Sequence, residues 1–138
     1  MPVPRLILDT NLLVGAAYAP GSASGRLLAA ATAGEVTLVV SPATFAEYRF
    51  IVPRSVRRPG GAARVLAALR RAEAVVPSSE VNVAARGVSE DPDDDKFLAL
   101  AAASAADAVL SNDHHLLDVG AYAGVPIGRP GAWTRGEL

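Results

Sequence analysis

Two acidic side chains follow two apolar segments that lie far apart in the sequence. Asp9 comes directly after residues 5–8, and Asp113 comes shortly after residues 108–111. Short apolar runs bounded by turn residues are typical of strands in a parallel sheet. The carboxyl ends of such strands face the crevice where open α/β sheets bind ligands, so we expect both carboxylates to line one crevice.

Two further acidic residues lie between them in the sequence. Glu47 falls within the apolar helical stretch 42–51, where it borders the face that the helix buries. Asp95 closes the acidic run 90–95 directly before another helix, and from the first turn it can lean toward the crevice while the apolar residues after it anchor the helix. We therefore expect one site formed by Asp9, Glu47, Asp95 and Asp113.

Each of these residues also has an ordinary structural explanation. Asp9 and Asp113 precede predicted helices and belong to a good helix-capping residue type. Asp95 carries a charge that the amino terminus of a helix favours. Glu47 is harder to explain in this way, because charged residues near a core are usually paired or bound to metal. One shared site is more economical than a separate explanation for each residue.

A cluster of four carboxylates has an electrostatic consequence. Two carboxylates about 5 Å apart repel each other by roughly 3 kcal/mol at an effective dielectric constant of about 20, so either a divalent ion lies among them or some are protonated. The chain has no cysteine, and its two histidines, His114 and His115, are neighbours whose side chains would point about 100° apart on a helix. An all-oxygen site suits Mg²⁺ or Mn²⁺, which can activate water for phosphodiester hydrolysis.

Composition limits the class of protein. The chain has 138 residues, 51% of them apolar, which is enough for a single domain over residues 1–138. No apolar stretch has the form of a membrane span or a signal peptide, so we expect a cytoplasmic protein. The formal charge of −1 argues against a generally basic nucleic-acid binder. Arginines nevertheless crowd residues 49–71, either as contacts for phosphates or as ordinary solvated surface.

Alternating strand and helix patterns predict an α/β fold. We expect four to five parallel strands, at residues 5–8, 36–40, 108–111 and 125–128, with an edge candidate at 74–76. We expect helices at residues 25–33, 62–72, 94–105 and 113–119. A further helix should begin at Pro42 and end at Pro53, residues 54–61 should form a loop, and residues 77–92 have no clear pattern. These elements give a single-domain parallel sheet flanked by helices, an α/β/α sandwich.

The motifs resemble those of the PIN domain family, in particular the compact prokaryotic toxins of type II toxin–antitoxin systems. The resemblance covers nearly the whole chain, and it depends on the order and spacing of several segments. These are residues 8–11, the helix with Glu47, residues 91–98 with their alanine-rich continuation, and residues 110–113 followed by two leucines.

The resemblance implies a fold, an activity and partners. Four residues match the family's acidic metal-binding set, namely Asp9, Glu47, Asp95 and Asp113. Ser111 matches its small hydroxyl residue, and Asn11 matches a supporting polar position. The implied protein is a Mg²⁺- or Mn²⁺-dependent endoribonuclease that cuts single-stranded RNA, is inhibited by a small antitoxin and forms a homodimer. Residues 128–133 depart from the pattern because they lack a clear final helix.

Two other functions fit part of the pattern. A phosphoaspartate hydrolase would use Asp9 as a strand-end nucleophile, but it needs a second acid two residues later, where Asn11 stands. A PIN-like fold that holds RNA or a protein partner without cutting it is the alternative from a different class. Metal-dependent cleavage that is lost in an Asp9→Asn variant would exclude this binding module.

Overall fold

A six-stranded sheet forms the centre of the protein. The computed structural model describes residues 2–138. The strand order is β3-β2-β1-β4-β6-β5, in which β5 pairs with β6 in the antiparallel sense and the other neighbours pair in parallel. The strands are β1 (Arg5–Leu8), β2 (Thr37–Val40), β3 (Glu73–Ala74), β4 (Ala108–Leu110), β5 (Ala121–Tyr122) and β6 (Val125–Gly128).

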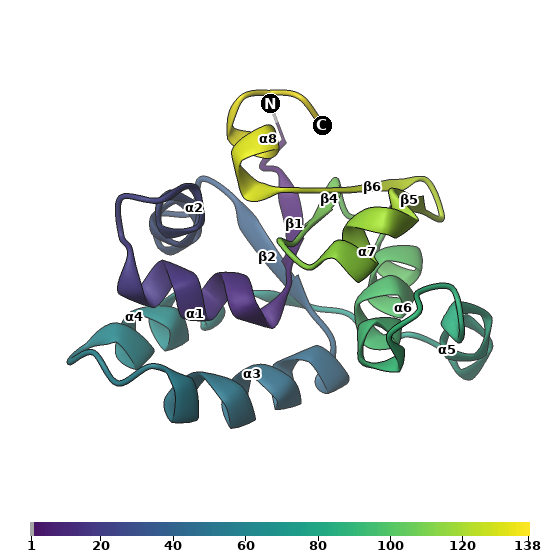
Figure 1. Cartoon of the computed structure of the whole chain (residues 1–138), viewed down its shortest axis with the longest axis horizontal. Coiled ribbons are helices and arrows are strands. Elements are labelled where there is room, and N and C mark those ends of the chain that lie inside the picture. Colours follow the sequence, from purple (N-terminus) through teal and green to yellow (C-terminus); the bar gives the residue numbers. More distant parts are fainter. Residues whose placement is uncertain (1) are drawn as a thin grey trace.

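Helices cover the sheet on both sides. They are α1 (Thr10–Tyr18), α2 (Ala23–Thr32), α3 (Pro42–Ser55), α4 (Gly61–Leu69), α5 (Ser79–Ala85), the short 3₁₀ helix η1 (Pro92–Asp94), α6 (Asp95–Ser104), α7 (His114–Val119) and α8 (Pro130–Thr134). Figure 1 shows α1, α2 and α4 on the left of the strands, α5 and α6 on the right, and α3 along the lower edge. This arrangement confirms the predicted α/β class with a mostly parallel sheet between helices.

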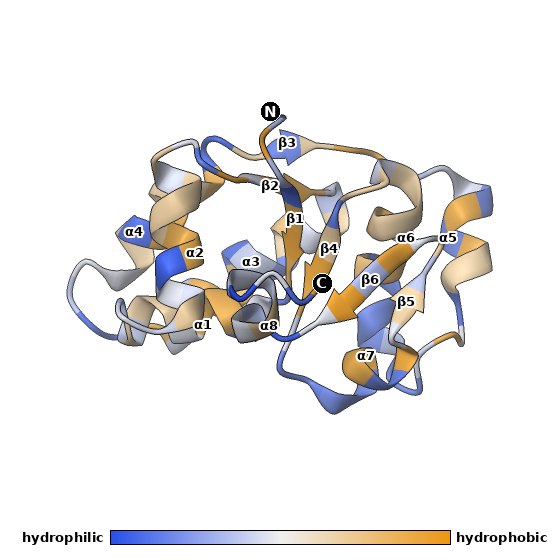
Figure 2. Cartoon of the chain, turned by 90° about the horizontal axis from the view of Figure 1, so that it is seen from above, coloured by the Kyte–Doolittle hydropathy of each residue, from blue (hydrophilic) through white to orange (hydrophobic). Residues whose placement is uncertain are grey.

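The central strands are buried because both of their faces are apolar. Leu6 and Ile7 of β1 and Val109 of β4 are fully buried, as strands covered by helices on both sides require. Figure 2 shows strongly hydrophobic colouring along the central strands β1 and β4. The core therefore fixes the positions of the strand ends.

The register of two neighbouring strands sets the position of the candidate site. Leu8 at the end of β1 lies opposite Leu110 at the end of β4, and the backbone N–H of Asp9 donates to the Leu110 carbonyl at 3.0 Å. The next strand along the chain, β2, pairs with one edge of β1, whereas β4 pairs with its other edge. The carboxyl ends of β1 and β4 thus form a switch point of the sheet, where such folds bind ligands.

Several predicted boundaries were wrong. The prediction that α3 ends at Pro53 fails, because the helix continues to Ser55 and closes with the N–H of Val56 donating to the Val52 carbonyl. Pro53 removes one helical hydrogen bond, but its fixed φ is compatible with a helix, and the helix runs for two more residues. A final helix, α8, does form, although it is only five residues long and begins at Pro130, a favourable first-turn residue.

The helix α5 and the strand β5 are among the elements that had no predicted counterpart. The segment without a clear pattern contains α5, whose capping residue Ser78 accepts from the Val81 N–H at 3.2 Å. The short strand β5 pairs with β6 through a tight connection that includes Gly124 in a left-handed conformation (φ +80°). Within residues 2–138, every helix is too short or too polar to cross a membrane.

Candidate metal centre

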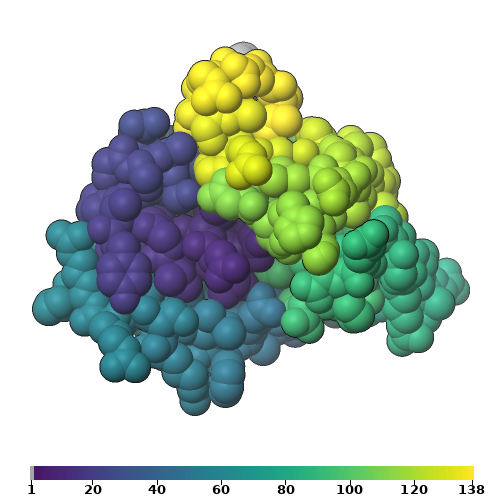
Figure 3. All heavy atoms as spheres, viewed as in Figure 1, coloured from purple at the N-terminus to yellow at the C-terminus, as the bar shows by residue number. Residues whose placement is uncertain are grey.

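An acidic cleft of about 200 Å³ opens at the carboxyl ends of β1 and β4. Its lining residues are Asp9, Thr10, Asn11, Glu47, Ile51, Asp91, Asp93, Asp94, Phe97 and Asp113. In Figure 3 the start of α1, the middle of α3 and the segment around residue 113 meet on one face of the molecule. Residues that are distant in the sequence are therefore brought to one hollow.

Asp9 and Asp113 lie where the sequence predicts them, at two adjacent strand ends. Ser111 links them, because its hydroxyl donates to Asp9 Oδ2 at 2.8 Å and accepts from the Asp113 N–H at 2.9 Å. Asp9 is buried, and this burial raises the pKa of its carboxyl, as do the nearby charges of Asp113 and Glu47, while the Ser111 hydrogen bond lowers it. The charged form of Asp9 is therefore disfavoured unless a cation lies nearby.

Asp94, and not Asp95, faces the cleft. The side chain of Asp94 is buried and accepts from the Ser89 hydroxyl at 2.8 Å. Asp95 is absent from the cleft lining, and its Oδ1 is buried without a hydrogen-bond partner among residues 2–138. The expectation that Asp95 leans into the crevice is therefore not met. Asp94 is the last residue of the 3₁₀ turn η1, whereas Asp95 is the first residue of α6, so the two neighbours belong to different elements.

Three carboxylates already have a spacing that suits a metal ion. One oxygen from each of Asp91, Asp94 and Asp113 lies within 4.8 Å of the other two. The pKa of Asp94 is raised to about 6, chiefly by burial and also by the charges of Asp113, Asp91 and Asp9, against the lowering effect of the Ser89 hydrogen bond. A divalent cation among these oxygens would relieve this repulsion.

Glu47 lines the cleft from α3, and both of its oxygens are engaged. The Thr10 hydroxyl donates to Oε2, and Lys96 Nζ lies 2.9 Å from Oε1. Lys96 also donates to the Asp93 carbonyl at 2.6 Å, so it ties Glu47 to η1. Glu47 is thus held in one orientation beside the carboxylates of Asp9 and Asp94.

A comparison with known families decides what this fold is. A model of the PIN domain matches residues 5–115. The chain belongs to the PIN domain family. PIN domains are in general nucleases and typically bind divalent metals.

A solved structure shares the fold of this PIN domain. It is VapBC2 from Rickettsia felis bound to a DNA fragment from its promoter, at 17% sequence identity and a TM-score of 0.62. The similarity covers 89% of this chain and 96% of the other. At this identity the likeness shows the common fold. A search of curated proteins found no match.

The remaining predicted site residue in the PIN cleft is Asn11. It is exposed on the first turn of α1 and lines the cleft, where its amide can donate to an anionic oxygen. Asn11 therefore lies at the opening of the site, whereas Ser111 lies beneath it.

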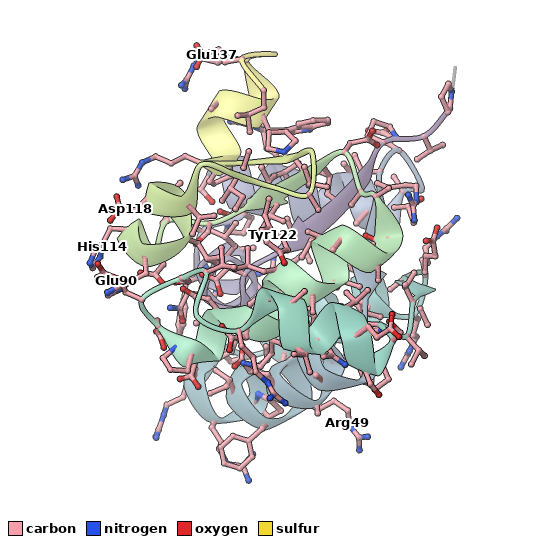
Figure 4. The ribbon with its side chains drawn as sticks, turned by 90° about the vertical axis from the view of Figure 1, so that its right-hand side faces the viewer. Arg49, Glu90, His114, Asp118, Tyr122 and Glu137 are labelled. Carbon is pink, nitrogen blue, oxygen red and sulfur yellow. The ribbon has the colours of Figure 1, made fainter. Side chains whose placement is uncertain are left out.

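The histidine pair of this PIN domain differs from its expected geometry. The rings of His114 and His115 do not diverge, because their centroids lie 4.1 Å apart. With Asp113 they also offer ligand atoms within 4.8 Å of one another, but neither histidine lines the cleft. Figure 4 shows His114 at the edge of the molecule, so this histidine lies at the surface, outside the cleft lining.

Sequence reasoning missed several residues of the PIN cleft. In the sequence, Asp91 and Asp94 appear only as members of an acidic run. The run alone does not indicate which of its side chains face the cleft. Thr10 and Lys96 gave no sign that they would contact Glu47. The two residues come from α1 and α6, so only the folded chain brings them to α3.

Proposed function

We propose that this PIN domain is a Mg²⁺- or Mn²⁺-dependent endoribonuclease. The observation that carries the proposal is the set of Asp91, Asp94 and Asp113 oxygens within 4.8 Å of one another, beside the buried Asp9. These donors are all oxygen atoms, which suits Mg²⁺ or Mn²⁺ better than zinc. We infer cleavage within the RNA strand, because the cleft is open at the surface.

Five carboxylates of the cleft would hold the ion. We propose Asp9, Glu47 and Asp113 from the predicted set, Asp94 in place of Asp95, and Asp91, which shares the close spacing of Asp94 and Asp113. Such an ion lowers the pKa of a bound water and stabilises the charge that develops on phosphorus and on the leaving oxygen.

The chain's own residues position this chemistry. Ser111 holds Asp9 by a hydrogen bond to Oδ2 and leaves its other oxygen for the cleft. Thr10 and Lys96 fix the Glu47 carboxylate from two sides. Asn11 at the opening would donate from its amide to a phosphate oxygen of the RNA.

A cellular role can be proposed from the likeness to a solved structure. The similar structure contains VapBC2 with promoter DNA, which supports a toxin–antitoxin role here. We propose that the chain is a toxin, that a small antitoxin protein inhibits it and that it forms a homodimer in the cytoplasm. Co-expression with the product of an adjacent small gene, followed by purification through a tag on the nuclease, should recover both proteins together.

Cleavage of a labelled RNA of mixed sequence tests the nuclease. The wild-type protein should cut the RNA with Mn²⁺ or Mg²⁺ and should not cut it with EDTA. Asp9→Asn should lose at least about 100-fold in rate, because a charge that holds the ion is lost. Tight, metal-independent RNA binding without cleavage by either protein would contradict the proposal and favour a binding module.

A further inference from the structure

The aromatic ring of Phe50 on α3 is exposed to solvent. Phe50 is 58% exposed, and the guanidinium of Arg54 lies 3.9 Å from the centre of its ring. Arg54 is anchored there, because it also donates to the Phe50 carbonyl at 2.7 Å. The ring and the guanidinium thus form a fixed stack that faces solvent.

This stack belongs to a shallow hollow of about 290 Å³. Its lining residues are Ala46, Arg49, Phe50 and Arg54, and we call it the Arg–Phe hollow. It combines a flat apolar surface with two positive charges. Single-stranded nucleic acids bind to surfaces of this kind, because bases stack on aromatic rings and phosphates pair with arginine.

The Arg–Phe hollow adjoins the acidic cleft on the same helix. Phe50 follows Glu47 by three residues and Arg54 follows Ile51 by three, and both Glu47 and Ile51 line the cleft. Residues three apart are neighbours on a helix surface. Figure 4 shows Arg49 extending into solvent, so this part of the hollow is open to a ligand.

Electrostatics requires such a surface near the cleft. The cleft is lined by six carboxylates, which repel the phosphates of an RNA strand. Affinity for a polyanion comes from cations that replace its counterions, so it has to come from outside the cleft. The arginines of the hollow are the nearest positive charges on α3 that face solvent without a carboxylate partner among residues 2–138.

We infer that the Arg–Phe hollow binds the single-stranded RNA next to the cut, with one base stacked against Phe50 and Arg54. This inference rests on the proposed function for the nature of the ligand. It assigns the start of the arginine-rich stretch 49–71 a role in holding the substrate.

Binding of a fluorescent single-stranded RNA of about twelve nucleotides, measured by anisotropy in EDTA with the full chain, tests the inference. Phe50→Ala should weaken binding about tenfold, whereas Phe50→Trp should retain it because the stacking surface persists. Arg54→Ala should weaken binding and reduce the salt slope by about 0.7. Arg70→Ala removes the same charge from an exposed position at the end of α4 and should have little effect.

An abasic oligonucleotide of the same length gives a further control. Wild type and Phe50→Ala should bind it equally, since no base can stack. Equal affinity of Phe50→Ala and wild type for the intact RNA would overturn the inference. So would a change from dimer to monomer in Phe50→Ala, seen by light scattering, with RNA binding unchanged.

The binding assay also separates this inference from the proposed function, because EDTA prevents metal-dependent cleavage. If the protein binds RNA through Phe50 but never cuts it, the proposed nuclease function is rejected and the proposed role of the Arg–Phe hollow stands. If the wild-type protein cuts RNA, and Phe50→Ala cuts and binds RNA equally well, the proposed nuclease stands and only the role of the Arg–Phe hollow is rejected.

Discussion

At the scale of single residues, the cleft gathers more negative charge than its surroundings neutralise. Asp9 and Asp94 are buried, and their raised pKa values reflect this burial together with neighbouring carboxylates. Lys96 compensates only Glu47, to which it lies at 2.9 Å. The charges of Asp9 and Asp94 thus oppose folding unless they are protonated or bound to a cation.

Asp94 should make the metal-free protein less stable as the pH rises. Its pKa is about 6 in the folded chain, above its ordinary value, so between about pH 4 and pH 6 the folded state holds a proton that the unfolded state has released. The free energy of unfolding therefore falls with rising pH across this window. In EDTA, thermal melts should lose roughly 3–5 °C over this range in wild type and less in Asp94→Asn.

Asp95→Asn is the matched control for this pH dependence, because it changes the neighbouring carboxylate outside the cleft. The same slope in Asp94→Asn as in wild type would contradict the assignment of the pH dependence to Asp94.

At the scale of elements, α3 and β1 are held together directly beneath the site. The buried hydroxyl of Tyr48 donates to the Leu8 carbonyl, one residue before Asp9. Burial raises the pKa of Tyr48, so this hydroxyl keeps its proton for the hydrogen bond. This contact sets how far Glu47 on α3 stands from the end of β1.

Tyr48→Phe should destabilise the protein by about 1–2 kcal/mol, because it leaves the Leu8 carbonyl without this partner in a buried position. Urea unfolding measures the loss. Tyr18→Phe is the control, since the Tyr18 hydroxyl donates to the Ser55 carbonyl at an exposed site and should cost less. A smaller effect at Tyr48 than at Tyr18 would show that the buried contact does not anchor α3.

Elements were easier to predict from the sequence than the orientation of side chains. Two apolar runs in the sequence correctly predicted the strands β1 and β4. The carboxyl ends of these strands lie at the same edge of the sheet, so Asp9 lies beside Ser111. Asp94 ends the 3₁₀ turn before α6 and lines the cleft, whereas Asp95 begins α6, and no periodic pattern in the acidic run distinguishes the two residues. Contacts such as Lys96 with Glu47 depend on how helices pack and leave no local signal.

At the scale of the whole molecule, one ion site would connect both halves of the fold. Asp9 follows β1, Asp113 follows β4, and Asp94 precedes α6, so a cation bound to all three would link segments that are distant in the sequence. Such an ion binds only the folded chain and therefore stabilises it by mass action.

Mn²⁺ should raise the melting temperature of the wild-type protein at pH 7. An ion at about 100 times its Kd adds about 2.7 kcal/mol to the free energy of unfolding. Asp113→Asn should melt at a similar or higher temperature in EDTA, because it removes repulsion, but it should gain little from Mn²⁺. An equal gain in Asp113→Asn and wild type would contradict an ion bound at this carboxylate.

The most direct test of the account is the rate of RNA cleavage in Mn²⁺ by Asp94→Asn and Asp95→Asn, measured side by side with wild type. The two variants remove the same charge from adjacent positions, and only Asp94 lines the cleft. We predict that Asp94→Asn loses at least about 100-fold in rate, whereas Asp95→Asn stays within a few-fold of wild type. An active Asp94→Asn together with an inactive Asp95→Asn would contradict the proposed metal centre.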